Sequence, residues 1–206
     1  MLAPVGLLAI VCMPFVGKMV GHVDPRRLAT FSFLIFALVL WMRSLFNTQA
    51  DIETILVPTV IQGLGMAFFF IPLVTMAFAG LAPERIAAAS GLSNFVRITA
   101  GAMGTSIATT LWESRTALHH VQLTEQLGGA TSTAAAETLA KLRASGLDSE
   151  QIAAFVNRLV DQQAAMLGAN DVFAGSALLF LLMIGLVWLA RPAGHGAAAA
   201  DAGAVH

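Results

Sequence analysis

Arg97 is the side chain in this sequence whose position best suits chemistry inside a membrane. It is the one charged residue among the 27 residues from Ile86 to Trp112. If this stretch is one helix, Arg97 lies ~18 Å from Arg85 and ~22 Å from Trp112, while a bilayer core is ~30 Å thick. A guanidinium near the midplane costs at least ~2.5–3.5 kcal/mol, so it is expected to face a polar cavity or a partner helix. Arg97 is therefore interpreted as a cavity residue linked to substrate or proton, or as a structural bridge between helices.

The residues around Arg97 predict two different helix faces. Spacings of three and four residues place polar and small side chains in one stripe, which we expect to face inward; its members are Ser90, Asn94, Arg97, Gly101, Gly104 and Ala108. Larger apolar side chains fill the opposite side. Asn94 either orients the guanidinium or bonds a backbone carbonyl. Gly101 and Gly104 are interpreted as helix-packing residues in preference to a flexible gate.

The composition predicts the class of protein to which this helix belongs. The chain is 57% hydrophobic and 11% charged, against about 25% charged residues in soluble domains, and its mean hydropathy is +0.79. A net charge of -1 argues against electrostatic capture of nucleic acid. The single cysteine, Cys12, excludes an internal disulfide framework. We therefore expect an all-α membrane protein.

Five apolar stretches are candidate transmembrane helices. They are residues 2–20, 28–46, 53–79, 86–112 and 172–190. The first has no positively charged leader, so it is not interpreted as a signal peptide. Asp24 is placed to N-cap the second. Pro58 and Pro72 interrupt the third, which membrane helices tolerate, and Pro72 is assigned to helix packing.

Residues 113–171 form the polar block of the chain and are predicted to be an extracytoplasmic loop with amphipathic helices. One such helix begins at Asp148, with Gln151 at the capping-box position. We expect it to lie on the bilayer surface or on neighbouring loops, and an outer partner protein is the alternative. His119 and His120 are interpreted as an interfacial polar pair, not as metal ligands. Residues 191–206, rich in Ala and Gly, predict a disordered cytoplasmic tail.

Basic residues predict the orientation in the membrane. The loops after the first and third stretches, together with the tail, contain Lys18, Arg26, Arg27, Arg85 and Arg191, while the loop after the second has no basic residue. The positive-inside rule then places the C-terminus in the cytoplasm and the polar block outside. Arg43, near the outer end of the second helix, is expected to extend to the interface.

Gln62, Met66 and Phe69 are candidate cavity residues of the third helix. Gln62, the tenth residue of its span, can donate and accept hydrogen bonds and is interpreted equally as cavity lining or as a link between helices. Met66 and Phe69 would offer a polarizable surface to varied ligands. Packed or lipid-facing side chains are the commoner explanation for such residues.

Several motifs occur in a fixed order along the chain. They are Leu2–Leu7 with Gly17–Thr30, then Gln62–Pro72 with Phe78–Leu81, then Ser93–Arg97 with Gly101–Ser106, and finally Leu118–Leu123. In order and spacing they resemble the C-terminal part of the fourteen-span drug:proton antiporters of the major facilitator superfamily, of the EmrB/QacA type and its EmrB branch most closely. The resemblance covers the chain except the tail and the middle of the polar block.

The resemblance implies that the five helices form most of the second of two six-helix bundles. It implies multidrug efflux by proton-coupled antiport in the bacterial inner membrane, driven by the proton gradient without a cofactor. The family's proton-coupling carboxylates lie mainly in the first bundle, and no Asp or Glu here lies deep in a predicted span. The chain is thus expected to be inactive alone. Its expected partners are membrane lipid, amphipathic drug-like molecules, the missing N-terminal part and a periplasmic adaptor protein.

Residues 17–27 resemble the second copy of the superfamily's signature loop. In that loop glycines such as Gly17 let helices approach, while an acid and arginines, here Asp24, Arg26 and Arg27, form cytoplasmic pairs that hold one gate state. The sequence departs from the pattern at Gly21, where an acid is usual. A helix cap with positive-inside charges is the alternative interpretation.

Two other classes of function are weighed against a transporter. A non-transporting membrane scaffold, or a truncated remnant, is the main alternative. An intramembrane enzyme would need a catalytic constellation, and the sequence contains no HExxH, no GxSxG and no paired acids within the spans. We therefore expect a protein that is not an enzyme and has no metal site.

Overall fold

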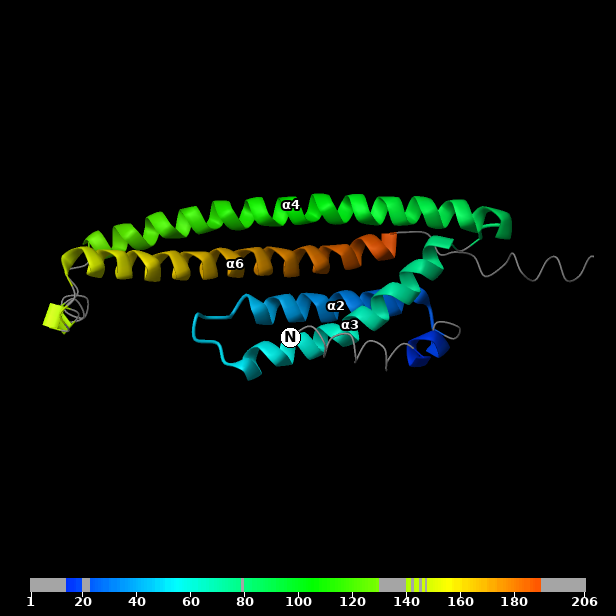
Figure 1. The fold of residues 1–206 in the computed structure, drawn as a ribbon. Helices are drawn as coiled ribbons and strands as arrows, with labels where there is room; N and C mark the ends of the chain where they lie inside the picture. Colours follow the sequence, from blue (N-terminus) through cyan, green and yellow to red (C-terminus); the bar gives the residue numbers. More distant parts are fainter. Residues whose placement is uncertain are drawn as a thin grey trace, which may run out of the picture.

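Four long helices contain most of the residues that the structure describes (Figure 1). The computed structural model describes residues 14–19, 23–78, 80–129, 140–141, 143–144, 146 and 148–189. The helices are α2 (Pro25–Arg43), α3 (Ile52–Phe78), α4 (Pro83–Gly129) and α6 (Ser149–Leu189). None of the residues in these described ranges is in a strand. The predicted all-α fold class is therefore confirmed.

The second predicted helix begins at the cap that its sequence indicates. Asp24 Oδ1 accepts a hydrogen bond from the backbone N–H of Arg26 at 3.0 Å, and Pro25 occupies the first turn of α2. The helix ends at Arg43, and the N–H of Ser44 still donates to the carbonyl of Leu40. Residues 44–51 then reverse the chain into α3.

Small residues bring α2 and α3 close together. The fully buried hydroxyl of Ser32 donates to the carbonyl of Gly65 at 2.9 Å. A Cβ added at Gly65 would lie 2.9 Å from Ile35 Cγ2, so a glycine is needed for this approach. Close packing of this kind is what associates helices in lipid, where burial of apolar surface gives little driving force.

Aromatic side chains join α6 to the α2–α3 pair. Phe33 and Phe36 of α2 each contact Phe69 of α3 and Phe180 of α6, with ring centroids 5.2–5.9 Å apart. Farther along, the indole N–H of Trp188 donates to Thr30 Oγ1 at 3.1 Å. α2 therefore lies against both α3 and α6.

α4 and α6 form a second, longer antiparallel pair (Figure 1). They have 47 and 41 residues. The indole N–H of Trp112 in α4 donates to the carbonyl of Ala165 in α6 at 3.0 Å. Beyond the connection between α2 and α3, the two long helices continue side by side as an extension of the bundle.

The helices cross the boundaries expected from the sequence. α4 contains the predicted span 86–112 and continues into the polar block, while α6 runs from that block through the predicted span 172–190 up to Leu189. The physical reason is the lack of helix breakers, since neither 105–127 nor 149–167 contains Gly or Pro. The described parts of the polar block are thus largely continuous with the helices of the spans, and the extracytoplasmic position of this block stays a prediction.

Three of the predicted spans coincide with helices that suit a membrane by composition. Among the described residues, the helices long and apolar enough to cross a bilayer are Pro25–Arg43, Ile52–Val74 and Ser149–Leu189. α4 is long enough but is not one of these three, because the polar stripe around Arg97 lowers its hydropathy. The span 2–20 falls mainly outside the described residues, and the tail 191–206 falls entirely outside them. The count of five transmembrane helices stays a prediction.

Candidate functional site

The structure brings Arg97 and Asn94 together on α4. Arg97 Nη2 donates to Asn94 Oδ1 at 2.7 Å, as residues one helical turn apart allow. Both side chains are exposed. The carboxamide therefore orients the guanidinium, and no hydrogen bond to another described residue is formed by the remaining N–H groups of Arg97.

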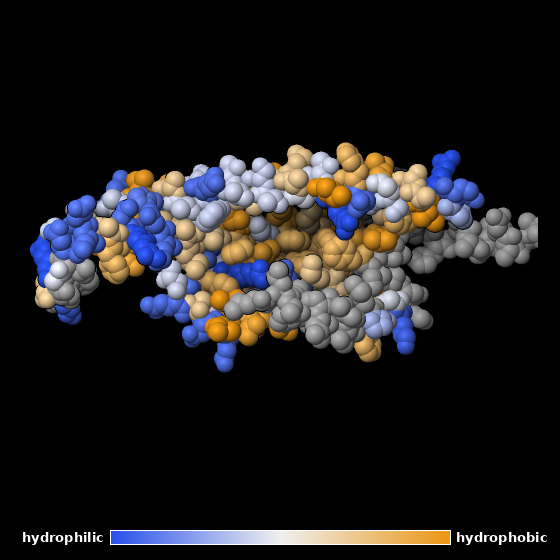
Figure 2. All heavy atoms as spheres, viewed as in Figure 1, coloured by the Kyte–Doolittle hydropathy of each residue, from blue (hydrophilic) through white to orange (hydrophobic). Residues whose placement is uncertain are grey.

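The first part of α4 has open surface on both of its faces. Within the stripe, nothing described lies within 4 Å of a Cβ added at Gly101 or Gly104. On the opposite side, Phe95, Ile98 and Met103 are 66%, 63% and 62% exposed. Figure 2 shows α4 with apolar and polar residues side by side on its surface. Apolar surface of this extent is typical of a helix that contacts lipid or further helices.

Gln62 has a partner that the sequence did not predict. Arg43 Nη2, at the end of α2, donates to Gln62 Oε1 of α3 at 2.7 Å, and both side chains are half-buried. Arg43 was expected to extend to the interface, but its side chain lies in the α2–α3 pair. Nothing in the linear sequence relates these residues, because the contact depends on how the two helices dock.

Met66 and Phe69 lie on α3 beyond Gln62. Phe69 is half-buried, and its ring contacts those of Phe33, Phe36 and Phe70. It therefore packs between helices in the described structure. Met66 is half-buried, one turn after Gln62, and Pro72 is fully buried.

The residues of the predicted gating loop lie near the start of α2. Asp24 caps the helix, and the backbone of Arg26 supplies the hydrogen bond to it. Arg27 is exposed, and Arg26 is half-buried. No atom of the described residues lies within 4 Å of a Cβ added at Gly17. These positions fit both a gating loop and a helix cap with surface charges.

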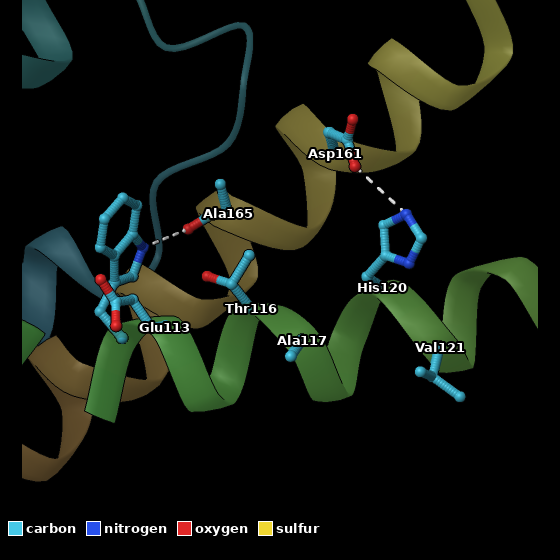
Figure 3. A pocket seen from close by; sticks show the side chains of 8 residues that line it. Glu113, Thr116, Ala117, His120, Val121, Asp161 and Ala165 are labelled. Carbon is cyan, nitrogen blue, oxygen red and sulfur yellow. Dashed lines mark hydrogen bonds and ion pairs between the residues drawn. The ribbon is translucent and has the colours of Figure 1, made fainter. Parts of the chain in front are cut away.

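A polar cluster joins α4 and α6 near the connection between α2 and α3. His120 pairs with Asp161 at 3.2 Å (Figure 3). His119 lies 2.9 Å from Asp171, whose carboxylate also lies 3.9 Å from Arg115. Beside His120 is a shallow, mainly apolar groove of about 600 Å³. The two histidines, interpreted from sequence as an interfacial pair, thus each face a carboxylate of α6. Within the described ranges, no three His, Cys, Asp or Glu side chains are grouped to hold a metal ion.

No family model and no solved structure matches this chain significantly. The chain is 40% identical over 191 residues to the multidrug export protein EmrB of Escherichia coli K12, which covers 92% of the chain and 37% of EmrB. It is 38% identical over 193 residues to the fatty acid resistance protein FarB of Neisseria gonorrhoeae, covering 94% of the chain and 38% of FarB. A more distant relative, 25% identical over 134 residues, is the MFS-type transporter YhcA of Bacillus subtilis, with 65% of the chain and 24% of YhcA covered.

The chain thus spans a little over a third of the length of EmrB and of FarB. These relatives are named as transport and resistance proteins, not as enzymes, and the helices of this chain suit a membrane. The match extends over nearly the whole chain and includes the α4 stripe and the α2–α3 pair. The chain is therefore a homologue of the EmrB-type export proteins, and the region of similarity corresponds to a little over a third of such a protein.

Proposed function

We propose that this chain forms part of a proton-coupled exporter of amphipathic compounds in the bacterial inner membrane. The observation that carries the proposal is its 40% identity, over 92% of its length, to a named multidrug export protein. Because the chain corresponds to 37% of that relative, we propose that it transports only together with the further helices that such a protein contains.

The open polar stripe of α4 supports a place at the wall of a substrate path. A transporter of this kind binds its substrate between two helical repeats near the middle of the bilayer. Arg97, held by Asn94 and without further described partners, offers donors in that region. We propose that this stripe faces the path and that Gln62 and Met66 contribute from α3.

The positions of the acidic residues support a proposal that proton coupling in the complete transporter takes place outside this chain. Glu53 and Glu84 lie in the first turns of α3 and α4, while Glu113, Asp161 and Asp171 lie in or next to the extension. Proton coupling would therefore use carboxylates outside this chain, with no cofactor. In the proposed orientation the C-terminus is cytoplasmic, and the α4–α6 extension lies outside, where a periplasmic adaptor protein would meet it.

The proposal is tested with a chimera of Escherichia coli EmrB in which this chain replaces its homologous part. The chimera and the chain alone are produced at matched membrane abundance in a pump-deficient host, and drug accumulation is measured. We expect efflux from the chimera and none from the chain alone. An inserted but inactive chimera, efflux that survives collapse of the proton gradient, or clear resistance from the chain alone would contradict the proposal.

A further inference from the structure

Arg43 carries a positive charge that the described residues do not neutralise. Its hydrogen bond goes to a neutral carboxamide, that of Gln62. Arg43 is absent from the ion pairs formed by the described residues, although Asp51 and Glu53 follow closely in the chain and are exposed. The C-terminus of α2 compensates part of the charge, but it supplies no anion.

The Arg43 side chain reaches into the α2–α3 pair. In the antiparallel register set by Ser32 and Gly65, Arg43 lies level with the first turns of α3. Gln62 lies ten residues after Ile52, ~15 Å along the helix. The guanidinium therefore lies half-buried among apolar helices, where a lone charge is costly unless a partner reaches it.

Arg43 and Gln62 present hydrogen-bond donors, and among the described residues no acid forms an ion pair with Arg43. A guanidinium has five N–H groups arranged as a fork, and a single one is bonded to Gln62 within the described chain. The amide NH₂ of Gln62 has no described acceptor. Adjacent N–H donors of this kind bind carboxylate or phosphate oxygens with two parallel hydrogen bonds.

The side chains around Arg43 and Gln62 suit the apolar tail of a ligand. Phe36 and Leu40 precede Arg43 on the same side of α2, and Met66 follows Gln62 by one turn of α3; all three are half-buried. Figure 2 shows the surface between α6 and the α2–α3 pair as apolar and hollowed, with a hydrophilic patch within it. An acyl or aromatic tail would lie along these side chains while its charged end meets the donors.

We propose that Arg43 and Gln62 form a binding site for the negatively charged head of an amphiphile. The ligand is a carboxylate or phosphate ester with an apolar tail, which is the shared chemistry of a free amphipathic acid and an anionic membrane lipid. If the site binds a transported substrate, the inference rests on the proposed function. If the site binds a membrane lipid, the inference does not depend on the proposed function.

The experiment measures binding and does not require transport. The purified chain is placed in nanodiscs of phosphatidylcholine and titrated with a dansyl-labelled undecanoic acid and with the methyl ester of the same probe. Because hydrogen bonds to a charged group contribute strongly, we expect the acid to bind about tenfold more tightly than the ester. Equal affinity for the two probes would overturn the proposal.

Two variants test the residues by opposite changes. Arg43→Gln removes the charge, and Gln62→Glu supplies an internal carboxylate 2.7 Å from the guanidinium, so both are expected to abolish the preference for the acid. Gln62→Glu conserves size and adds an ion pair between α2 and α3, so it is expected to keep the helicity of the chain. Arg158→Gln is the matched control, because it removes the same charge from an exposed position of α6 and is expected to retain the preference.

A final arm identifies the source of the ligand. Phosphatidylglycerol in the nanodisc displaces the acid if the natural ligand is a membrane lipid, and it leaves binding unchanged if the ligand is a free amphipathic acid. If both Arg43→Gln and Gln62→Glu keep the preference for the acid, the proposal that Arg43 and Gln62 form the binding site is wrong. An inactive EmrB chimera with intact acid binding would contradict the proposed function alone.

Discussion

Gly168 of α6 lies directly against Thr116 of α4. A Cβ added at Gly168 would lie 2.6 Å from Thr116 Oγ1 and 2.9 Å from the Thr116 backbone nitrogen. Thr116 Oγ1 is buried and has no hydrogen-bond partner among the described residues. The two helices therefore meet backbone to backbone at this point, and the missing side chain of glycine is what allows the contact.

Gly168→Ala is expected to weaken the α4–α6 pair. The new methyl group meets backbone atoms that cannot rotate away, so we expect a loss of about 1–3 kcal/mol from overpacking, partly offset by the higher helix propensity of alanine. The loss is measured from helicity during unfolding in mixed micelles. Gly175→Ala is the control, because no atom in the described part of the chain lies within 4 Å of its added Cβ. Equal unfolding of the two variants would contradict the close contact.

Ser32→Ala tests the hydrogen bond between α2 and α3. The Ser32 hydroxyl is fully buried and donates to the Gly65 carbonyl at 2.9 Å. Hydrogen bonds between membrane helices average about 0.6 kcal/mol, so we expect a small loss of stability of this size. The matched control is Ser90→Ala, at an exposed position of α4. If both variants unfold like the parent chain, the hydrogen bond contributes nothing measurable.

The sequence predicted the class of fold because the relevant signals are local. The high apolar content predicted an all-α membrane protein, and Asp24 with Pro25 predicted the start of α2. The sequence did not predict that α4 continues past Trp112. Polar residues end the membrane-embedded part of a helix without ending the helix itself. Only Gly or Pro would break it, and α4 has neither between 105 and 127.

The candidate site was predictable only where its residues share one helix. The pairing of Arg97 with Asn94 follows from their spacing along α4. The pairing of Arg43 with Gln62 depends on the docking of α2 against α3, and the pairing of His119 with Asp171 depends on the register of α4 against α6. Such contacts between helices leave no periodic pattern in a single sequence.

Arg97→Ala in the EmrB chimera tests the role of the α4 stripe. If Arg97 lines the substrate path, the variant is expected to lower efflux, because the hydrogen-bond donors of the guanidinium are lost. Membrane abundance is expected to stay unchanged, because Arg97 is exposed and its removal leaves no buried gap. Asn94→Ala is expected to act in the same direction with a smaller effect, since it removes only the 2.7 Å contact that orients the guanidinium. Efflux of a fluorescent drug and immunoblots of membranes are measured together. Arg85→Ala, at an exposed position in the first turns of α4, is the control for loss of positive charge. Unchanged efflux, or loss of the protein itself from the membrane, would assign Arg97 to a structural role.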